Sequence, residues 1–288
     1  MTTLQLDDLR RRTSPFQLQR LLVLGLFLAA VIWSWRSTEM SVPALLKGWG
    51  NMISYVAGNP AIKDSGFFPP NLRQAGIVRY LVSMLETVQM AFLALLLAIL
   101  VAFPLSFLGS RNILQILIPG GGLRARVARG AIYGTVQTFA NLARSINELV
   151  WALMFVAAVG LGPMPGILAL GVHTSGVLVK LFSEGIENIQ REPLDALTAT
   201  GAGIVKAIRY AVLPQTTPFF VSMTLYRFES DVRSATILGF TGAGGIGVFL
   251  YDKLRSFENG DVTTILIIVV GTVAILDRAS AYIRRRYS

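Results

Sequence analysis

An uncharged run of 24 residues, from Thr87 to Ser110, constrains the fold of this chain more than any other feature. A helix needs about 20 predominantly apolar residues to cross the hydrocarbon core of a bilayer. Two shorter apolar runs, 21–35 and 262–276, are flanked by arginines whose side chains can extend to the membrane surface. Only 15% of the 288 residues are charged, whereas soluble domains contain about 25%. We therefore expect an integral membrane protein.

The apolar segments predict an all-α, polytopic helical bundle of about six transmembrane helices. We place the spans at about 20–36, 80–109, 146–162, 164–182, 211–236 and 261–280. We divide the chain into a cytoplasmic tail 1–20, a first transmembrane helix with an outer segment 21–79, and a core 80–288. Trp33, Trp35 and Arg36 end the first apolar run where a signal peptide would have small residues, so we expect a retained anchor.

Two helices are expected outside the spans. Residues 42–57 belong to an outer segment that contains Trp49, and they predict a short helix at the membrane interface, where Trp is enriched. Residues 123–143 are amphipathic, with arginines early and apolar residues later. This second helix either lies on the cytoplasmic surface or extends the third span.

The net charge of +10 is concentrated at alternate ends of the apolar segments. Arginines cluster at 10–20, 111–129 and 278–286, and the middle cluster contains no acidic residue. Basic residues of membrane proteins gather on the cytoplasmic side, so we expect both termini in the cytoplasm and the chain in the bacterial cell (plasma) membrane. The basic excess therefore indicates membrane topology, and we expect no nucleic-acid partner.

Residues that carry chemistry are scarce. The chain has no cysteine and one histidine, which excludes thiolate catalysis and a histidine-cluster metal site within one chain. Gly242-x-Gly244-x-x-Gly247 matches the dinucleotide pattern by letter, but no βαβ unit surrounds it, so we interpret these glycines as tight turns or close helix packing. No G-x-x-x-x-G-K-[ST] sequence is present. We expect no catalytic, cofactor-binding or metal site.

The segment 190–214 connects two predicted spans and contains its own helix signals. Pro193 suits the first turn of a helix, and Glu192 and Asp195 complement the helix dipole there. Gly201 is a helix stop, and Leu213-Pro214 begins the fifth span with its first residue biased away from helix. We predict a helix over 192–200 with Leu194, Ala196 and Leu197 as its apolar contact surface; the alternative is a polar turn.

This loop resembles the EAA loop of ABC-importer permeases: an acid and Ala, then Gly201 five residues after Ala196, and Leu-Pro after a small residue, Ala211. Asp195 replaces the usual Glu, and Leu197 replaces the second Ala. The resemblance implies that a separate ATPase subunit contacts this loop and pushes it. The coupling residues that it implies are Glu192, Leu194, Asp195, Ala196, Leu197, Gly201, Leu213 and Pro214.

Further segments resemble the permeases of phosphonate importers, the PhnE family. They are 144–153 (RSINELVWAL), 158–163 (AVGLGP), 210–215 (YAVLPQ), 226–235 (YRFESDVRSA) and 242–247 (GAGGIG), within a similarity that covers about 80–285. The resemblance implies a type I ABC-importer permease fold and a homodimer with two ATPase subunits and an extracytoplasmic binding protein. ATP and magnesium would bind to the ATPase. The implied substrates are phosphonate, phosphite or phosphate.

Four charged residues follow the apolar part of the fifth span: Arg227, Glu229, Asp231 and Arg233. A charge at membrane depth should be paired and should face the bundle interior or a wet cavity. Helical spacing pairs Arg227 with Asp231 and Glu229 with Arg233. One hypothesis is that the two arginines line the translocation path and meet an oxyanion, while the acids hold them. The other is a salt-bridge lattice at a dimer interface.

Three other polar residues fall near the third and fourth spans. Arg144 and Glu148 are also four residues apart, and we favour structural pairing over a gate contact in the translocation path. His173 is followed by Thr174 and Ser175, and we favour a hydrogen-bonded packing role over a proton relay.

Three other functions remain open at this point. If the resemblance to the EAA loop holds but the resemblance to phosphonate permeases does not, the chain would belong to an importer of a different small solute, such as methionine or another oxyanion. A membrane-embedded enzyme would need a catalytic constellation, and an ion-coupled secondary transporter would act without an ATPase.

Overall fold

The structure is a computed structural model that describes residues 15–58 and 66–287. These residues form helices, turns and irregular segments, without a strand in either range. The chain divides into two compact units, Met1–Val56 and Ala57–Ser288, which are described separately. The N-terminal arginines 10–12 and Pro60 lie outside the described residues.

In its described residues, the first unit contains two helices, α2 (Pro15–Ser37) and α3 (Val42–Ala57). Every residue of α2 from Leu21 to Trp35 is exposed, although almost all of them are apolar. A helix that is apolar on all sides needs a lipid or protein environment around it. The helix over 42–57 is confirmed as a helix, and its place at the membrane interface stays a prediction.

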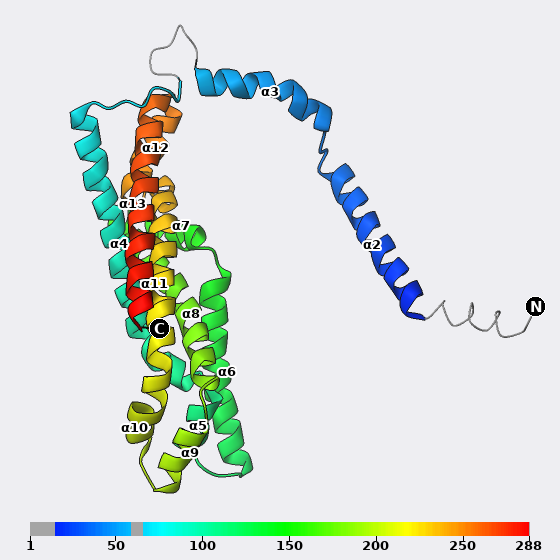
Figure 1. Ribbon diagram of the computed structural model, residues 1–288, viewed down its shortest axis with the longest axis vertical. Helices are drawn as coiled ribbons and strands as arrows, with labels where there is room; N and C mark the ends of the chain where they lie inside the picture. Colours follow the sequence, from blue (N-terminus) through cyan, green and yellow to red (C-terminus); the bar gives the residue numbers. More distant parts are fainter. Residues whose placement is uncertain (1–14, 59–65, 288) are drawn as a thin grey trace, which may run out of the picture. The chain divides into compact units, whose positions relative to one another are not determined.

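The second unit contains the remaining helices (Figure 1). Their bounds are α4 (Gln74–Leu108), α5 (Arg111–Leu117), α6 (Leu123–Ser145), α7 (Glu148–Val159), α8 (Pro163–Glu187), α9 (Glu192–Ala199), α10 (Ile204–Ala207), α11 (Leu213–Leu238), α12 (Ile246–Arg255) and α13 (Asn259–Tyr287). Figure 1 shows α4, α8, α11 and α13 running lengthwise, with α5, α9 and α10 at one end and α12 at the other.

Close backbone approach holds the centre of this unit together. The most extensive helix contact is between α4 and α8, followed by that between α6 and α8. At Gly176 of α8, an added Cβ would lie 2.8 Å from the carbonyl oxygen of Ala140 and 2.8 Å from the Cβ of Ala143, both on α6. Membrane helices use such small residues to bring their backbones together. Glycine at 176 therefore sets the spacing between α6 and α8.

The predicted third span, 146–162, is wrong. Helix α6 ends at Ser145, α7 begins at Glu148, and the two axes differ by 88°. Helix α7 has only 12 residues, about 18 Å at 1.5 Å per residue, which is shorter than the hydrocarbon core of about 30 Å. Helix α6 packs along α8 and buries Val136, Ala140 and Ala143, and it is apolar enough to cross a membrane only when it is taken together with α7 as one bent pair.

The start of α11 corrects a second expectation. Leu213 precedes Pro214, yet its backbone is α-helical, with φ −56° and ψ −43°. A π-helical turn over Ile208–Val212 leads directly into α11, and the N–H of Leu213 donates to the carbonyl oxygen of Ile208. A proline inside a helix removes one hydrogen bond and crowds the preceding turn. The wider π turn lets the chain pass through Pro214 without leaving the helix.

The glycine run between α11 and α12 forms turns, as predicted. Gly242, Gly244 and Gly245 all have positive φ, of 84°, 84° and 72°. Side chains are disfavoured in that region of conformational space, whereas glycine adopts it readily. The N–H of Gly162 donates to the carbonyl oxygen of Gly242 at 3.0 Å, so the run also joins the start of α8.

Among the described residues, four helices are long and apolar enough to cross a membrane: Gln19–Ser37, Gln74–Leu108, Pro163–Glu187 and Asn259–Arg286. Two bent helix pairs, α6 with α7 and the segment 204–241 with α12, raise that number to six if each pair is one span. The expectation of about six spans is therefore met, with two of them broken. The domain boundaries at residues 20 and 79 stay predictions.

Candidate functional site

Helix α9 forms where the sequence predicts a helix over 192–200, at the same end of the second unit as α5 and the start of α6 (Figure 1). Pro193 occupies its first turn together with Glu192, and Asp195 is also in that turn. The polar-turn alternative is thereby excluded. The arginine cluster at 111–129 and this loop lie at one end of the bundle, and their placement in the cytoplasm stays a prediction.

Gly201 ends α9 with a fixed geometry. Its φ is +77°, which favours glycine. The N–H of Gly201 donates to the carbonyl oxygen of Thr198, and the N–H of Ala202 donates to that of Leu197. These two bonds are the Schellman motif, which satisfies carbonyl groups that the helix leaves open. The predicted helix stop is confirmed.

The residues around α9 attach it to three other helices. The guanidinium of Arg191 donates to the side-chain oxygen of Asn112 on α5 at 3.2 Å, and the N–H of Gln190 donates to Gln215 on α11 at 3.0 Å. Asn112 in turn donates to the last carbonyl oxygens of α8. A cavity of about 470 Å³ lies beside α9 and is lined in part by Asn112, Asp195 and Gly201. A force applied to α9 therefore acts on α5, α8 and α11.

The apolar residues of α9 divide between two faces. Leu194 is only 4% exposed and Leu197 is half-buried, because both pack against the bundle. Ala196 and Glu192 are exposed. The expected contact surface of Leu194, Ala196 and Leu197 thus differs from the structure, in which only Ala196 of the three faces outward. Leu213 and Pro214 open α11, half-buried and exposed respectively.

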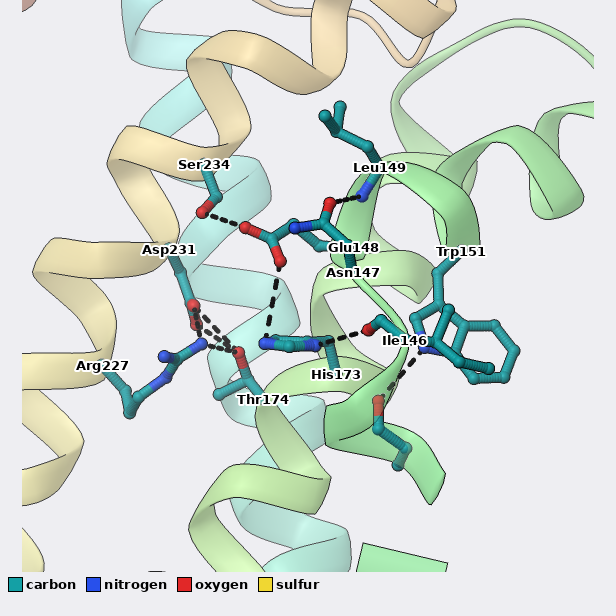
Figure 2. A network of polar contacts seen from close by, with 11 residues as sticks. Ile146, Asn147, Glu148, Leu149, Trp151, His173, Thr174, Arg227, Asp231 and Ser234 are labelled. Atoms are coloured by element: carbon teal, nitrogen blue, oxygen red, sulfur yellow. Dashed lines mark hydrogen bonds and ion pairs between the residues drawn. The ribbon is translucent and has the colours of Figure 1, made fainter. Parts of the chain in front are cut away.

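The second candidate site is a buried polar network inside the bundle (Figure 2). Asp231 is fully buried, and its carboxylate accepts hydrogen bonds from the hydroxyl of Thr174 on α8 at 2.8 Å and from Nη2 of Arg227 at 2.9 Å. The same Nη2 also donates to Thr174 at 3.0 Å. The predicted pair of Arg227 with Asp231 is confirmed. Nε of Arg227 is buried without a hydrogen-bond partner among the described residues.

Glu148 belongs to the same network but not through Arg144. Its Oε1 accepts from the hydroxyl of Ser234 at 2.7 Å, and its Oε2 lies 3.7 Å from Nε2 of His173. Arg144 instead donates to Asn141 at 3.2 Å. The predicted pair of Arg144 with Glu148 is wrong, because the break between α6 and α7 separates the two residues, and pairing at four-residue spacing needs a continuous helix.

His173 has a structural partner on its other nitrogen. Nδ1 lies 3.0 Å from the carbonyl oxygen of Ile146, at the break between α6 and α7. A carbonyl oxygen only accepts hydrogen bonds, so Nδ1 carries the proton in this contact. The packing role that we favoured is in agreement with this geometry, since the ring fills the corner between α7 and α8 and holds the break.

The predicted pair of Glu229 with Arg233 is also wrong. Glu229 is buried and accepts from Arg284 of α13 at 3.0 Å, while Arg233 lies 3.5 Å from Asp277 of α13. Successive helix residues are about 100° apart around the axis, so Arg227 and Asp231 face α8, whereas Glu229 faces the opposite side. The four charges therefore do not share one site.

Sequence reasoning missed several members of the network. Asn147 caps α7, since its side chain accepts from the N–H of Leu149 at 2.9 Å. An Asn followed by Glu is a helix-start signal, and it would have revealed the break at 146–147. Thr174 and Ser234 carry no such signal, because only the fold brings them to Asp231 and Glu148. In the two described ranges, no three His, Asp or Glu side chains converge as metal ligands would.

The comparison with protein families finds one match. The family described as "Binding-protein-dependent transport system inner membrane component" matches residues 117–288. This range contains α9, the polar network and most of the second unit.

Individual proteins give the same result. The phosphite transport system permease protein PtxC of Stutzerimonas stutzeri is 32% identical over 219 residues, 76% of this chain and 74% of that protein. The putative cryptic phosphonate transport system permease protein PhnE2 of Escherichia coli is 46% identical over 121 residues, 42% of this chain and 99% of that protein. A structure of the MetNI methionine ABC transporter covers 75% of this chain and 100% of its own, with a TM-score of 0.63 and 21% identity.

Proposed function

This chain belongs to the family of binding-protein-dependent transport system inner membrane components, and on that premise we propose that it forms the membrane path of an ATP-driven importer for a phosphorus oxyanion. It is a multi-pass inner-membrane protein with the type I ABC-importer permease fold. It is a transport component rather than an enzyme. Its substrate is phosphonate, phosphite or phosphate, as the names of its relatives suggest.

The rest of the assembly follows from the same proposal. Two copies of the chain enclose the path, each copy contacts one ATPase subunit, and an external binding protein delivers the anion. ATP and magnesium bind to the ATPase. The termini, α5 and α9 are cytoplasmic, because arginines gather there.

The observation that carries the coupling role is the attachment of α9. The helix projects from the bundle, yet Leu194 is buried beneath it and Arg191 and Gln190 bond to α5 and α11. A partner that closes on the exposed face of α9 would displace these helices together. Packed helices move between discrete arrangements rather than deforming continuously, so this displacement would switch the path between its outward-open and inward-open states.

Single cysteines test this contact, because the chain has none of its own. In the assembled transporter, Ala196→Cys is expected to crosslink to the ATPase subunit, since residue 196 is exposed. Leu194→Cys is the matched control: residue 194 is buried and should not react. The coupling role is refuted if residue 196 fails to crosslink in an active complex, or if residue 194 reacts equally well.

Arg227 is the residue that we assign to the anion path. Its guanidinium lies inside the bundle, Asp231 balances its charge, and its Nε has no partner among the described residues. A guanidinium presents several donors to the oxygens of a phosphorus oxyanion. Arg233 is exposed and faces α13, so we assign it to a structural pair with Asp277.

Uptake of radiolabelled substrate by the reconstituted complex tests this assignment. Arg227→Gln is expected to lower uptake about 10- to 100-fold, the effect of losing a hydrogen bond to a charged group, while Arg233→Gln keeps most of it. The double variant Arg227→Gln/Asp231→Asn avoids a buried unpaired carboxylate, and it should assemble with the ATPase but stay inactive. Near-normal uptake by the double variant would exclude Arg227 from the path.

A further inference from the structure

A second basic feature lies apart from the polar network, between α5 and the first three turns of α6. A pocket of about 330 Å³ is lined by Arg111, Leu114, Gln115, Arg126, Arg129, Gly130 and Tyr133. We call it the arginine pocket. Its lining contains three arginines and no acidic residue, and the whole segment 110–130 also lacks an acid. In the proposed transport function this charge only indicates the cytoplasmic side, and no ligand is assigned to it.

The fold holds two of the arginines in place. Arg129 donates from Nη1 to the carbonyl oxygen of Ile118 at 3.3 Å and from Nη2 to that of Gly120 at 3.1 Å, which fixes the loop between α5 and α6. The guanidinium of Arg111 lies 4.8 Å from the ring centre of Tyr133. Glu187 accepts from the backbone N–H of Arg111, but it does not line the pocket.

No ion pair compensates these three charges within the described residues. The salt bridges there involve other lysines and arginines. Arg126 is exposed and projects from α6 one turn after its start. Three neighbouring guanidinium groups repel one another, so a bound anion would stabilise the arrangement. Arginines bind phosphate groups in particular, because their donors match its oxygens.

The pocket also lies at the depth of lipid headgroups. Arg111 is the first charge after the uncharged run that ends at Ser110, so it marks the membrane boundary beside Tyr133. Arg126 lies seven residues from Tyr133 along α6, and both side chains line the same pocket, so the pocket begins at this boundary and extends away from the hydrocarbon core.

The alternative occupant is an acidic surface of the ATPase, and the geometry disfavours it. Gln115 of α5 lines both the arginine pocket and the cavity beside α9. Helix α5 therefore lies between the two hollows, and none of the residues of α9 lines the arginine pocket. From charge, depth and this separation, we propose that the arginine pocket binds the phosphate group of an anionic phospholipid, with Arg111 and Arg126 as its ligands and Arg129 holding the loop.

Native mass spectrometry of the purified full-length chain tests the proposal, with phosphatidylglycerol and phosphatidylcholine as the probes. The wild type should retain phosphatidylglycerol in preference. An arginine near an anionic lipid strengthens binding about fivefold, so Arg126→Gln should lose about that factor and Arg111→Gln/Arg126→Gln more. Arg124→Gln is the matched control, because Arg124 is exposed on the same turn of α6 but does not line the pocket.

Each outcome decides for or against the site. Selective loss in the Arg126 variants, with Arg124→Gln unchanged, supports it. Equal loss in all three variants indicates general attraction of charges and overturns it. Displacement of the lipid by inorganic phosphate at millimolar concentration would assign the pocket to a free anion instead. The same measurement is repeated on the assembled transporter, where unchanged lipid binding with loss of the ATPase from the complex would assign the pocket to protein docking. The measurement needs no transport activity, so it stands if the proposed substrate is wrong.

Discussion

Arg227, Asp231 and Thr174 show what helical spacing does and does not determine at the scale of single residues. The pair on α11 follows from a separation of four residues in a continuous helix. The same rule fails for Glu229 with Arg233, because Arg284 and Asp277 of α13 are closer partners. Sequence spacing therefore predicts ion pairs within one helix. It does not predict partners from another helix, because these depend on how the helices pack.

The stability of the polar network gives a prediction for Asp231. Asp231→Asn keeps the shape of the side chain but removes the charge that balances buried Arg227, so it should lower the free energy of unfolding by about 3–5 kcal/mol. Thermal unfolding in detergent measures this change. Asp277→Asn is the control, because that carboxylate and Arg233 are 45% and 46% exposed, and such pairs contribute about 1 kcal/mol or less. Similar losses in the two variants would contradict the described burial.

At the scale of helices, local signals located most elements and missed one break. Pro193 marks the start of α9 and Gly201 marks its end. Both signals are local, because proline suits the first turn of a helix and glycine readily adopts the positive φ that ends one. The apolar run 146–162 predicts one span, because hydropathy contains no information about a change in chain direction. The cap at Asn147 marks the start of a new helix and therefore indicates the break. The π turn before Pro214 had no signal in the sequence, since it depends on Ala211 and Val212 being buried against the bundle.

The contact between α6 and α8 predicts the effect of a small substitution. Gly176→Ala would place a methyl group 2.8 Å from the backbone of α6, so we expect a loss of about 1–3 kcal/mol from overpacking. Gly134→Ala on α6 is its control, because no heavy atom lies within 4 Å of the added Cβ. That variant should be neutral or up to about 1 kcal/mol more stable. Thermal unfolding of both purified variants in detergent measures the two changes. Equal stabilities would show that α6 and α8 are not in close contact at Gly176.

At the scale of the whole molecule, apolar runs and arginine clusters were enough to predict an all-helical membrane protein with about six spans, and the family match agrees. They do not determine how the bundle closes, because partners such as Thr174 and Asp231 are 57 residues apart in the chain.

The proposed orientation predicts which loops react from each side of the membrane. Ser256→Cys, exposed at the end of α12, should be labelled in intact spheroplasts by a maleimide that does not cross the membrane. Ala199→Cys, exposed at the end of α9, should be labelled only after the membrane is permeabilised. The reverse pattern would place α9 outside the cell and would exclude an ATPase contact.

The carboxylate of Asp231 already occupies the guanidinium that we assign to the anion path. An arriving oxyanion must compete with this carboxylate for the guanidinium. Its affinity for Arg227 would therefore be low, and it would dissociate quickly. Weak binding favours transport, because an anion bound tightly in the middle of the path would block the anions that follow it. Selection among solutes would then fall to the protein that captures them outside, and the membrane subunit could stay permissive without becoming leaky.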